Sequence, residues 1–315
     1  MRVIWQLKQL DAASSHSVAT IGNFDGMHQG HRALIALLRQ RAAECGTIST
    51  VILFEPQPLQ FFLKEKAPPR LMRLRDKLAV LRELGVEQVL CLRFNQTLAN
   101  TSADDFVKNI LVHALKIKSI LIGDDFRFGK NRQGDMALLQ QLSHQYFFNV
   151  EQYSSFYTET ERTSSTKIRQ LLQQGDCETA TQFLGAPYRI SAIVQHGLKL
   201  GRTLGFPTIN IAIPPSLRIL PYGIYVVHTK TVDTNLGFGA ASWGVRPTVS
   251  QGLQPLFEVH LFDTPNEALY HQRVFVSVYH RLRDELTFES LDALKEKIAQ
   301  DVLDARAFVE DKLHR

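Results

Sequence analysis

The sequence predicts an α/β chain of two domains: a parallel sheet covered by helices, then a small antiparallel β-barrel followed by a long C-terminal helix. Up to residue 152, short apolar runs alternate with segments of helical periodicity, whereas from Tyr188 onward short strands follow one another between turn residues. At 315 residues, 44% of them hydrophobic, the chain is long enough to bury two cores.

Four apolar runs in the first half predict strands, at 17–21, 48–54, 87–92 and 118–122. Helical periodicity predicts helices at 75–84, 102–115 and 134–145, and another that begins near residue 28. Strands separated by helices in this way indicate a parallel sheet with helices on both faces, in which ligands bind beyond the carboxyl ends of the strands. Three motif-like stretches lie at such ends, at 22–31, 54–58 and 123–129.

The pattern changes near residue 185. A helix at 177–184 ends at Gly185 and is followed by Pro187, so we expect domains at 1–184 and 185–315. Beyond this point, six strands at 189–195, 206–211, 222–229, 236–243, 255–262 and 273–280 predict a closed six-stranded barrel. Apolar residues spaced along 290–313 predict one amphipathic helix that packs against it.

The composition favours a cytoplasmic protein and gives no sign of a nucleic-acid-binding or membrane protein. Lys and Arg number 36 against 31 Asp and Glu, and this mild excess forms no basic run of the kind that binds nucleic acid. Cys45, Cys91 and Cys177 are isolated and make no disulfide framework. No apolar run approaches the length of a membrane span, so we expect no membrane association. The oligomeric state is left open.

The stretch from Gly22 to His31 joins the first apolar strand to a helix and holds three glycines. Glycines let backbone approach a phosphate, and a helix N-terminus offers free N–H groups and a positive dipole end. His28 and His31 share one helical face, so we expect both imidazoles to supply positive charge around the α-phosphate in a nucleotidyl transfer. A solvated histidine pair, or a metal site with Asp25, is the alternative.

Two further stretches of the first half carry polar groups suited to a nucleotide. Ser165, Thr166 and Arg169 open a helix and form a second candidate phosphate site, with a simple N-cap as the equal alternative. Asp124 and Asp125 follow an apolar strand and are candidates for ribose hydroxyls, flavin polar groups or a metal, with an ordinary turn as the alternative.

In the second half, Thr208 and Asn210 project to the same side of a strand. Hydroxyl and amide oxygens are hard neutral ligands that suit Mg²⁺ carrying nucleotide phosphates, although a polar strand face explains so short a stretch as well. Glu258 lies within an apolar strand and is either a paired residue at the barrel mouth or a general base.

Taken together, the motifs resemble those of the prokaryotic bifunctional riboflavin kinase/FMN adenylyltransferase (FAD synthetase) family over nearly the whole chain. They are Gly-Asn-Phe-Asp-Gly-x-His-x-Gly-His at 22–31, Phe-x-Pro-x-Pro at 54–58, Gly-x-Asp-Phe-Arg-Phe-Gly at 123–129, Ser-Ser-Thr-x-Ile-Arg at 164–169, Gly-Arg-x-x-Gly-Phe-Pro-Thr-x-Asn at 201–210, Arg-Pro-Thr at 246–248, Glu-Val-His-Leu at 258–261 and Leu-Arg-x-Glu-x-x-Phe at 282–288. An ordered set of this kind is highly specific.

The resemblance implies a Rossmann-like nucleotidyltransferase domain that transfers AMP from ATP to FMN, giving FAD and pyrophosphate. It implies that His28 and His31 contact the phosphates of ATP. It further implies an ATP site that includes Gly22, Asn23, Phe24, Gly30, Ser165, Thr166 and Arg169, and a flavin near Asp125 and Phe126.

For the barrel, the resemblance implies a riboflavin kinase that phosphorylates the 5′-hydroxyl of riboflavin with ATP. Thr208 and Asn210 would bind Mg²⁺, and Glu258 would accept the hydroxyl proton. Gly201 is expected to contact ATP and Arg283 the flavin. The substrates implied are riboflavin, FMN and ATP, with Mg²⁺ as the cofactor.

The chain departs from the family pattern at a few positions, all in the expected kinase half: Ile209, Ser242, Trp243, Val245 and His271. These departures raise an alternative, a monofunctional FAD synthetase or other nucleotidyltransferase whose barrel binds flavin but has impaired kinase activity. A flavin-binding or nucleic-acid-binding regulator is the non-enzymatic alternative. Because Thr208, Asn210 and Glu258 are intact, we expect both activities.

Overall fold

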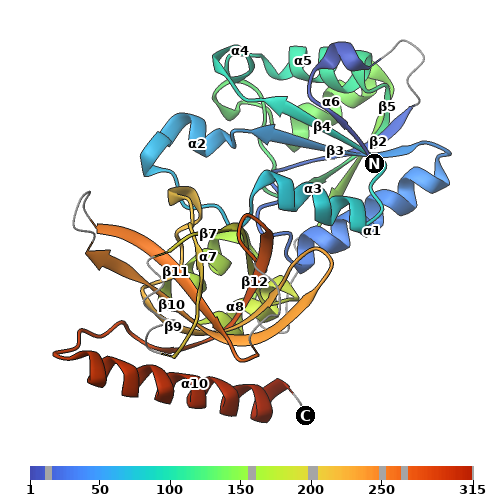
Figure 1. Ribbon diagram of the computed structural model, residues 1–315. Coiled ribbons are helices and arrows are strands. Elements are labelled where there is room, and N and C mark those ends of the chain that lie inside the picture. The colour runs from blue at the N-terminus through green and yellow to red at the C-terminus, as the bar shows by residue number, and fades with distance from the viewer. Residues whose placement is uncertain (11–15, 155–160, 198–204, 248–252, 264–268, 314–315) are drawn as a thin grey trace. The chain divides into compact units, whose positions relative to one another are not determined.

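The computed structural model describes residues 1–10, 16–154, 161–197, 205–247, 253–263 and 269–313. Contacts divide the chain into two compact units, and each is described by itself. The first unit comprises Met1–Pro68 and Arg73–Ser164, and the second comprises Pro69–Met72 and Ser165–Arg315. The predicted α/β fold with a parallel sheet and a closed barrel is confirmed (Figure 1).

The first unit is built on a six-stranded, all-parallel sheet with strand order β1-β4-β3-β2-β5-β6. Its strands are β1 (Arg2–Ile4), β2 (Ser17–Ile21), β3 (Ile48–Glu55), β4 (Gln88–Arg93), β5 (Ile117–Gly123) and β6 (Asn149–Tyr153). The central strand β2 is buried along its whole length, as expected of a strand covered on both faces. Its carboxyl end therefore opens at the middle of the sheet edge where ligands bind in such folds.

Helices cover both faces of this sheet (Figure 1). They are α1 (Gln29–Glu44), α2 (Pro58–Leu63), α3 (Leu74–Glu83), α4 (Gln96–Ala99), α5 (Ala103–Phe106) and α6 (Met136–Tyr146). The helix predicted at 102–115 continues from α5 into a π-helix, Val107–Ala114. Ser102 caps α5 through its side chain, and Leu111 and Leu139 share one apolar cluster with the sheet.

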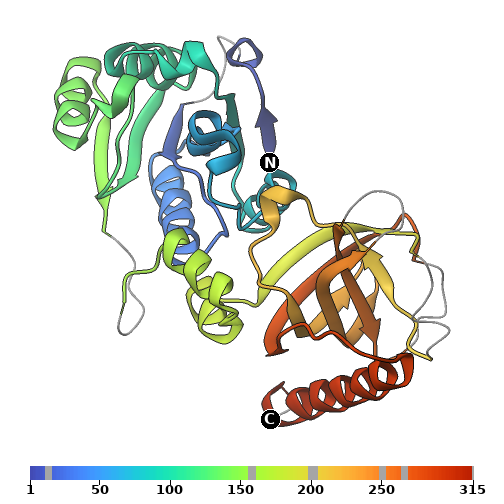
Figure 2. The same ribbon diagram turned by 90° about the vertical axis from the view of Figure 1, so that its left-hand side faces the viewer.

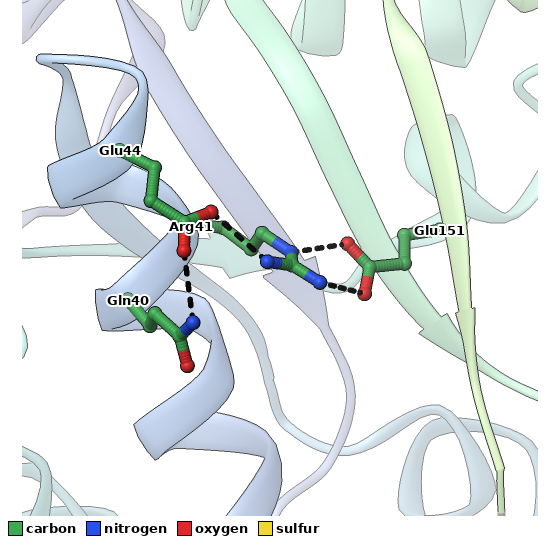
Figure 3. A network of polar contacts seen from close by, with 4 residues as sticks. All are labelled: Gln40, Arg41, Glu44 and Glu151. Atoms are coloured by element: carbon green, nitrogen blue, oxygen red, sulfur yellow. Dashed lines mark hydrogen bonds and ion pairs between the residues drawn. The ribbon is translucent and has the colours of Figure 1, made fainter.

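Helix α1 is tied to the edge strand β6 near its carboxyl end. Arg41 donates to both carboxylate oxygens of Glu151, from Nε at 2.7 Å and from Nη2 at 3.0 Å (Figure 3). The same guanidinium binds Glu44 at 2.9 Å, and Gln40 donates to the other oxygen of Glu44 at 2.8 Å. A bidentate pair of this kind fixes orientation as well as distance, so it holds α1 in place on the sheet.

The second unit is a closed antiparallel barrel with strand order β10-β11-β8-β7-β12-β9. Its strands are β7 (Tyr188–Gln195), β8 (Ile209–Ile211), β9 (Gly223–Lys230), β10 (Asn235–Pro247), β11 (Leu253–Leu261) and β12 (Arg273–Arg283). The long helix α10 (Leu291–Leu313) lies along the barrel wall, where Ala305 and Val309 pack with Val226 and Ala240 (Figures 1 and 2). The amphipathic helix expected at 290–313 is thereby confirmed.

Two short helices, α7 (Ser165–Gln174) and α8 (Cys177–Leu184), pack with the barrel. Leu172 and Phe183 belong to the same buried cluster as the inner faces of the barrel strands, so contacts place both helices in the second unit. The functional boundary expected after Leu184 remains a prediction, because packing and function need not divide a chain at the same residue. Among the described residues, no helix combines the length and the apolar character needed to cross a membrane.

Candidate active sites

The loop between β2 and α1 has an unusual backbone. Phe24 and Met27 both have φ of +46°, and Gly26 between them has φ of +83°. Residues other than glycine rarely adopt positive φ, and such conformations persist only where the surroundings enforce them. Here the enforcement comes from burial, since Phe24 is 2% exposed and Met27 is fully buried. The loop is therefore held in one shape at the carboxyl end of the central strand.

The two histidines of this loop meet at the N-terminus of α1. His28 is the N-cap, and its Nδ1 accepts a hydrogen bond from the backbone N–H of His31 at 3.4 Å. The imidazole rings stack with centroids 3.6 Å apart and planes 20° apart, and Phe24 lies 5.0 Å from the ring of His31. Because Nδ1 of His28 accepts, a neutral His28 carries its proton on Nε2.

Both imidazoles are neutral near pH 7 in this structure. Burial lowers the pKa of His28 to about 4, against a smaller opposing effect of Asp25. Burial also lowers the pKa of His31 well below its usual value, and His28 and Lys77 lower it further. The lowered pKa values favour neutral imidazoles, so the positive charge expected of the histidines remains a prediction. Neutral imidazoles offer N–H groups beside the positive end of the α1 dipole.

His31 has an unsatisfied atom at this site. Its Nδ1 is buried and has no hydrogen-bond partner among the residues that the structure describes. A buried polar atom without a protein partner is suited to contact a bound ligand. A group of three or more His, Cys, Asp or Glu side chains suited to a metal does not occur in the described part of the chain, which disfavours the metal-site alternative.

A row of three polar residues crosses the barrel. Asn210 on β8 pairs directly with Glu258 on β11, and Glu258 pairs in turn with Ser242 on β10. Residues that oppose each other on antiparallel strands project from the same face, so these three side chains lie side by side. Thr208 precedes the first residue of β8 and lines a cavity together with Glu258. The structure thus places Glu258 next to Asn210 and along one cavity with Thr208.

Ser242 and Glu258 of this row border a cavity of about 370 Å³ between the barrel and the segment that leads into α10. Thr208, Ser242 and Glu258 line it on the barrel side, and Leu294 and Ile298 of α10 line it on the other. Glu258 is only 9% exposed. A mostly apolar cavity with a few convergent polar groups is the usual form of a site for a small organic molecule.

Asn210 has an unpaired oxygen like that of a metal ligand. Its Oδ1 is buried and has no hydrogen-bond partner within the described ranges. Space for the side chain comes from Gly197, where an added Cβ would lie 2.1 Å from Nδ2 of Asn210. The amide therefore holds its position only because residue 197 has no side chain, and its free oxygen fits the chemistry of a hard cation.

Comparison with known proteins identifies the two units. A family model described as FAD synthetase matches residues 10–167, and one described as riboflavin kinase matches residues 184–309. A bifunctional riboflavin kinase/FMN adenylyltransferase from Haemophilus influenzae is 43% identical over 98% of this chain and 99% of its own length. The chain belongs to the bifunctional riboflavin kinase/FMN adenylyltransferase family.

Other members of this family are similar over the same extent. The protein from Escherichia coli K12 is 42% identical over 98% of both chains, and that from Pseudomonas fluorescens is 42% identical over the full length of both. A crystal structure described as a macrolide-efflux protein from Streptococcus pneumoniae superposes with a TM-score of 0.83, at 27% identity and with 99% of each chain covered. The resemblance inferred from the motifs is confirmed.

The FAD synthetase region has a second group of polar residues at the end of β5. Asp124 accepts from Nη2 of Arg162 at 2.9 Å, and Asp125 lies 3.5 Å from the same nitrogen. Phe126 stacks on Phe128 with centroids 5.3 Å apart. Sequence reasoning identified the two aspartates and Phe126 but missed Arg162 as their partner, since the pairing joins residues 38 apart.

Three residues expected at the ATP phosphates lie on α7, which packs with the kinase barrel. Ser165 and Thr166 occupy its first turn, and Nε of Arg169 donates to the backbone oxygen of Pro69 at 2.8 Å. They belong by contacts to the second unit, whereas His28 and His31 belong to the first. Gly201, also expected at ATP, lies outside the described residues.

The riboflavin kinase region also shows where Arg283 lies. It lines the cavity, and its Nε donates to Asp301 of α10 at 2.7 Å while Nη2 contacts the other carboxylate oxygen. Asp301 is 4% exposed, and Lys297 lies 3.5 Å from it. Sequence reasoning missed Asp301, although an acid on the apolar face of a helix signals a buried partner.

Proposed function

We propose that this chain phosphorylates riboflavin with ATP to give FMN and then transfers AMP from ATP to FMN, giving FAD and pyrophosphate. The observation that carries the proposal is that each of the two units has its own group of polar side chains suited to a phosphate-transfer reaction. One is the stacked histidine pair at the N-terminus of α1, and the other is the row of Asn210, Glu258 and Ser242 beside the cavity. The family relationship supports one activity for each.

In the adenylyl transfer, a phosphate oxygen of FMN attacks the α-phosphorus of ATP, and the bond to the β-phosphate oxygen breaks. His28 and His31 donate N–H groups to the phosphates at the N-terminus of α1, where the dipole favours the charge of the leaving pyrophosphate. Gly22, Asn23 and Phe24 line this site together with Gly30. The unsatisfied Nδ1 of His31 supports a role in contacting the nucleotide.

Ser165, Thr166 and Arg169 are proposed to contact phosphates of ATP, as the resemblance implies. Hydroxyls and backbone N–H groups at the start of α7 suit a phosphate, and a guanidinium adds charge. Asp125 and Phe126 are proposed to contact the flavin of FMN. An aromatic ring that already stacks on a neighbour, as Phe126 does on Phe128, presents a flat surface for a ring system.

In the kinase reaction, Glu258 accepts the proton of the riboflavin 5′-hydroxyl as its oxygen attacks the γ-phosphorus of ATP and ADP leaves. Thr208 and Asn210 would hold Mg²⁺, and the unpaired Oδ1 of Asn210 fits that role. When bound, the cation neutralises negative charge on the phosphates. Gly201 is proposed to contact ATP.

The flavin ring of riboflavin is proposed to occupy the cavity. Leu256 from the barrel and Leu294 and Ile298 from α10 provide apolar walls for a flat ring. Arg283 lines the same space and remains our candidate for the flavin contact, held in position by Asp301. We propose a cytoplasmic location for both reactions, which the three free cysteines support.

A riboflavin assay tests both halves at once. Purified protein is incubated with riboflavin, ATP and Mg²⁺, and the flavins are separated by chromatography. We expect FMN first and FAD later. If FAD forms only when FMN is provided, the alternative of a monofunctional FAD synthetase holds, and the departures at Ile209, Ser242, Trp243, Val245 and His271 become candidate causes.

A further inference from the structure

Helix α3 carries a buried lysine on its apolar face. Lys77 is 3% exposed and stands three residues before Val80 and four before Leu81, both of which are buried. Lysine is almost never fully buried unless its ammonium group has a partner. None of the family motifs in the sequence includes this residue.

The Lys77 ammonium reaches the loop of the histidines. It donates a hydrogen bond to the backbone oxygen of Asn23, between Gly22 and the positive-φ residue Phe24. A loop with this backbone needs outside contacts to keep its shape. The lysine therefore fixes the segment that leads into His28.

Lys77 also supplies a positive charge at this place. The pKa of His31 is lowered by burial first, then by the neighbouring His28 and by the charge of Lys77. Because burial favours the neutral form of both histidines, the ammonium of Lys77 is a positive charge that contacts this loop directly.

We propose that Lys77 is a positioning residue of the adenylyl-transfer site, which holds the Asn23 loop in the conformation that presents His28 and His31 to the phosphates of ATP. Its positive charge, held at this loop by the contact with Asn23, attracts the triphosphate. The inference rests on the proposed adenylyltransferase function.

Three variants separate position from charge. Lys77→Met removes the charge and the hydrogen bond at similar volume, and Lys77→Arg keeps the charge. Arg75→Met is the matched control, because Arg75 is exposed on the same helix and its loss changes the net charge equally. Limited proteolysis of the first unit reports whether that unit is folded in each variant, and FMN formation from riboflavin controls for damage to the second unit.

FAD formation from FMN is measured over a range of pH. We expect Lys77→Met to lower kcat/KM for ATP by about 10²-fold, as loss of one preorganised donor does elsewhere. Removing a positive neighbour raises the pKa of His31, so the acid limb of the profile should move to higher pH. Lys77→Arg should restore that limb, and Arg75→Met should match the wild type. Wild-type kinetics in Lys77→Met, or equal losses in Lys77→Met and Arg75→Met, would overturn the inference.

An activity-independent readout distinguishes this inference from the proposed function. The imidazole nitrogens of His31 are titrated by NMR in the wild type and in Lys77→Met, with Asp25 and His28 unchanged in both. A higher pKa in the variant supports the contact between Lys77 and this site even if the wild type makes no FAD. An unchanged pKa refutes it even if the wild type is active.

Discussion

Glu258 and Asn210 lie directly opposite each other on strands β11 and β8, so the carboxylate and the amide share one face of the barrel. They stand 48 residues apart in the chain, and only the closure of the barrel brings them together. A base and a metal-binding oxygen on adjacent positions can act on the same hydroxyl and phosphate. Changes to either residue should therefore affect the kinase reaction.

Replacing Glu258 by Gln should abolish most of the kinase activity while leaving the shape of the site unchanged. An amide cannot accept the hydroxyl proton, and loss of a general base slows such steps by about 10²–10⁴-fold. FMN formation from riboflavin is measured by chromatography. FAD formation from added FMN is the control and should stay at the wild-type rate. Equal loss of both activities in a folded variant would show that the assignment of two sites is wrong.

Replacing His28 and His31 together by Ala should have the opposite effect. The variant loses both N–H groups that are proposed to contact the phosphates, so FAD formation from FMN should fall below detection. FMN formation from riboflavin should persist. A double variant that still makes FAD at a rate near that of the wild type would show that the histidines are not part of the active site.

A methyl group at residue 197 should displace Asn210. The added Cβ of Gly197→Ala would lie 2.1 Å from Nδ2 of Asn210, so one of them must move. We expect lower kinase activity, a weaker dependence on Mg²⁺ and a loss of stability of about 1–3 kcal/mol, typical of overpacking.

The double-mutant cycle with Asn210→Ala tests the cause of this loss. If the clash with Asn210 is responsible, Gly197→Ala should destabilise the Asn210→Ala protein much less than it destabilises the wild type. The melting temperatures of the four proteins provide the measurement. If Gly197→Ala lowers the stability of the Asn210→Ala protein as much as that of the wild type, the strain comes from a contact other than the one with Asn210.

Acid should destabilise the first unit through its buried histidines. An unfolded chain protonates His28 near pH 6.5, whereas the folded chain does so only near pH 4. Between these values the unfolded state binds more protons, so the free energy of unfolding falls as the pH is lowered, by about 1.4 kcal/mol per pH unit for one such group. His31 adds to the effect in the same direction.

The contribution of His28 is isolated with His28→Gln, which has no proton to gain. Urea unfolding is followed by limited proteolysis of the first unit in the wild type and the variant. Above pH 6.5 the two curves should run parallel, and below it the wild type should lose stability faster. Parallel curves down to pH 4 would contradict the lowered pKa of His28.

Periodicity and motifs predicted the architecture well where elements are long and apolar. The buried strand β2 and the amphipathic helix α10 lie within one residue of the expected bounds. The edge strands β1 and β6 were missed, because one has three residues and the other alternates weakly between polar and apolar positions. The short helix α2 was missed as well, since six residues give too little periodicity.

Within the sites, residue types were predictable but pairings were not. The neighbourhood of Asn210, Glu258 and Ser242 depends on strand order and register, which a barrel fixes only through long-range packing. The charge state of His28 depends on burial, which no local pattern measures. Lys77 had a local signal, a cation at an apolar position of a helix.

The short segment Pro69–Met72 belongs to the second unit although the chain on both sides of it belongs to the first. Leu71 is buried in the core of the second unit, and the N–H of Arg70 bonds to the oxygen of Ser216 at 2.6 Å. A single proteolytic cut therefore cannot release two intact halves. Any fragment that begins at α7 loses Leu71 from its interior, so dissecting the two reactions requires point variants rather than truncation.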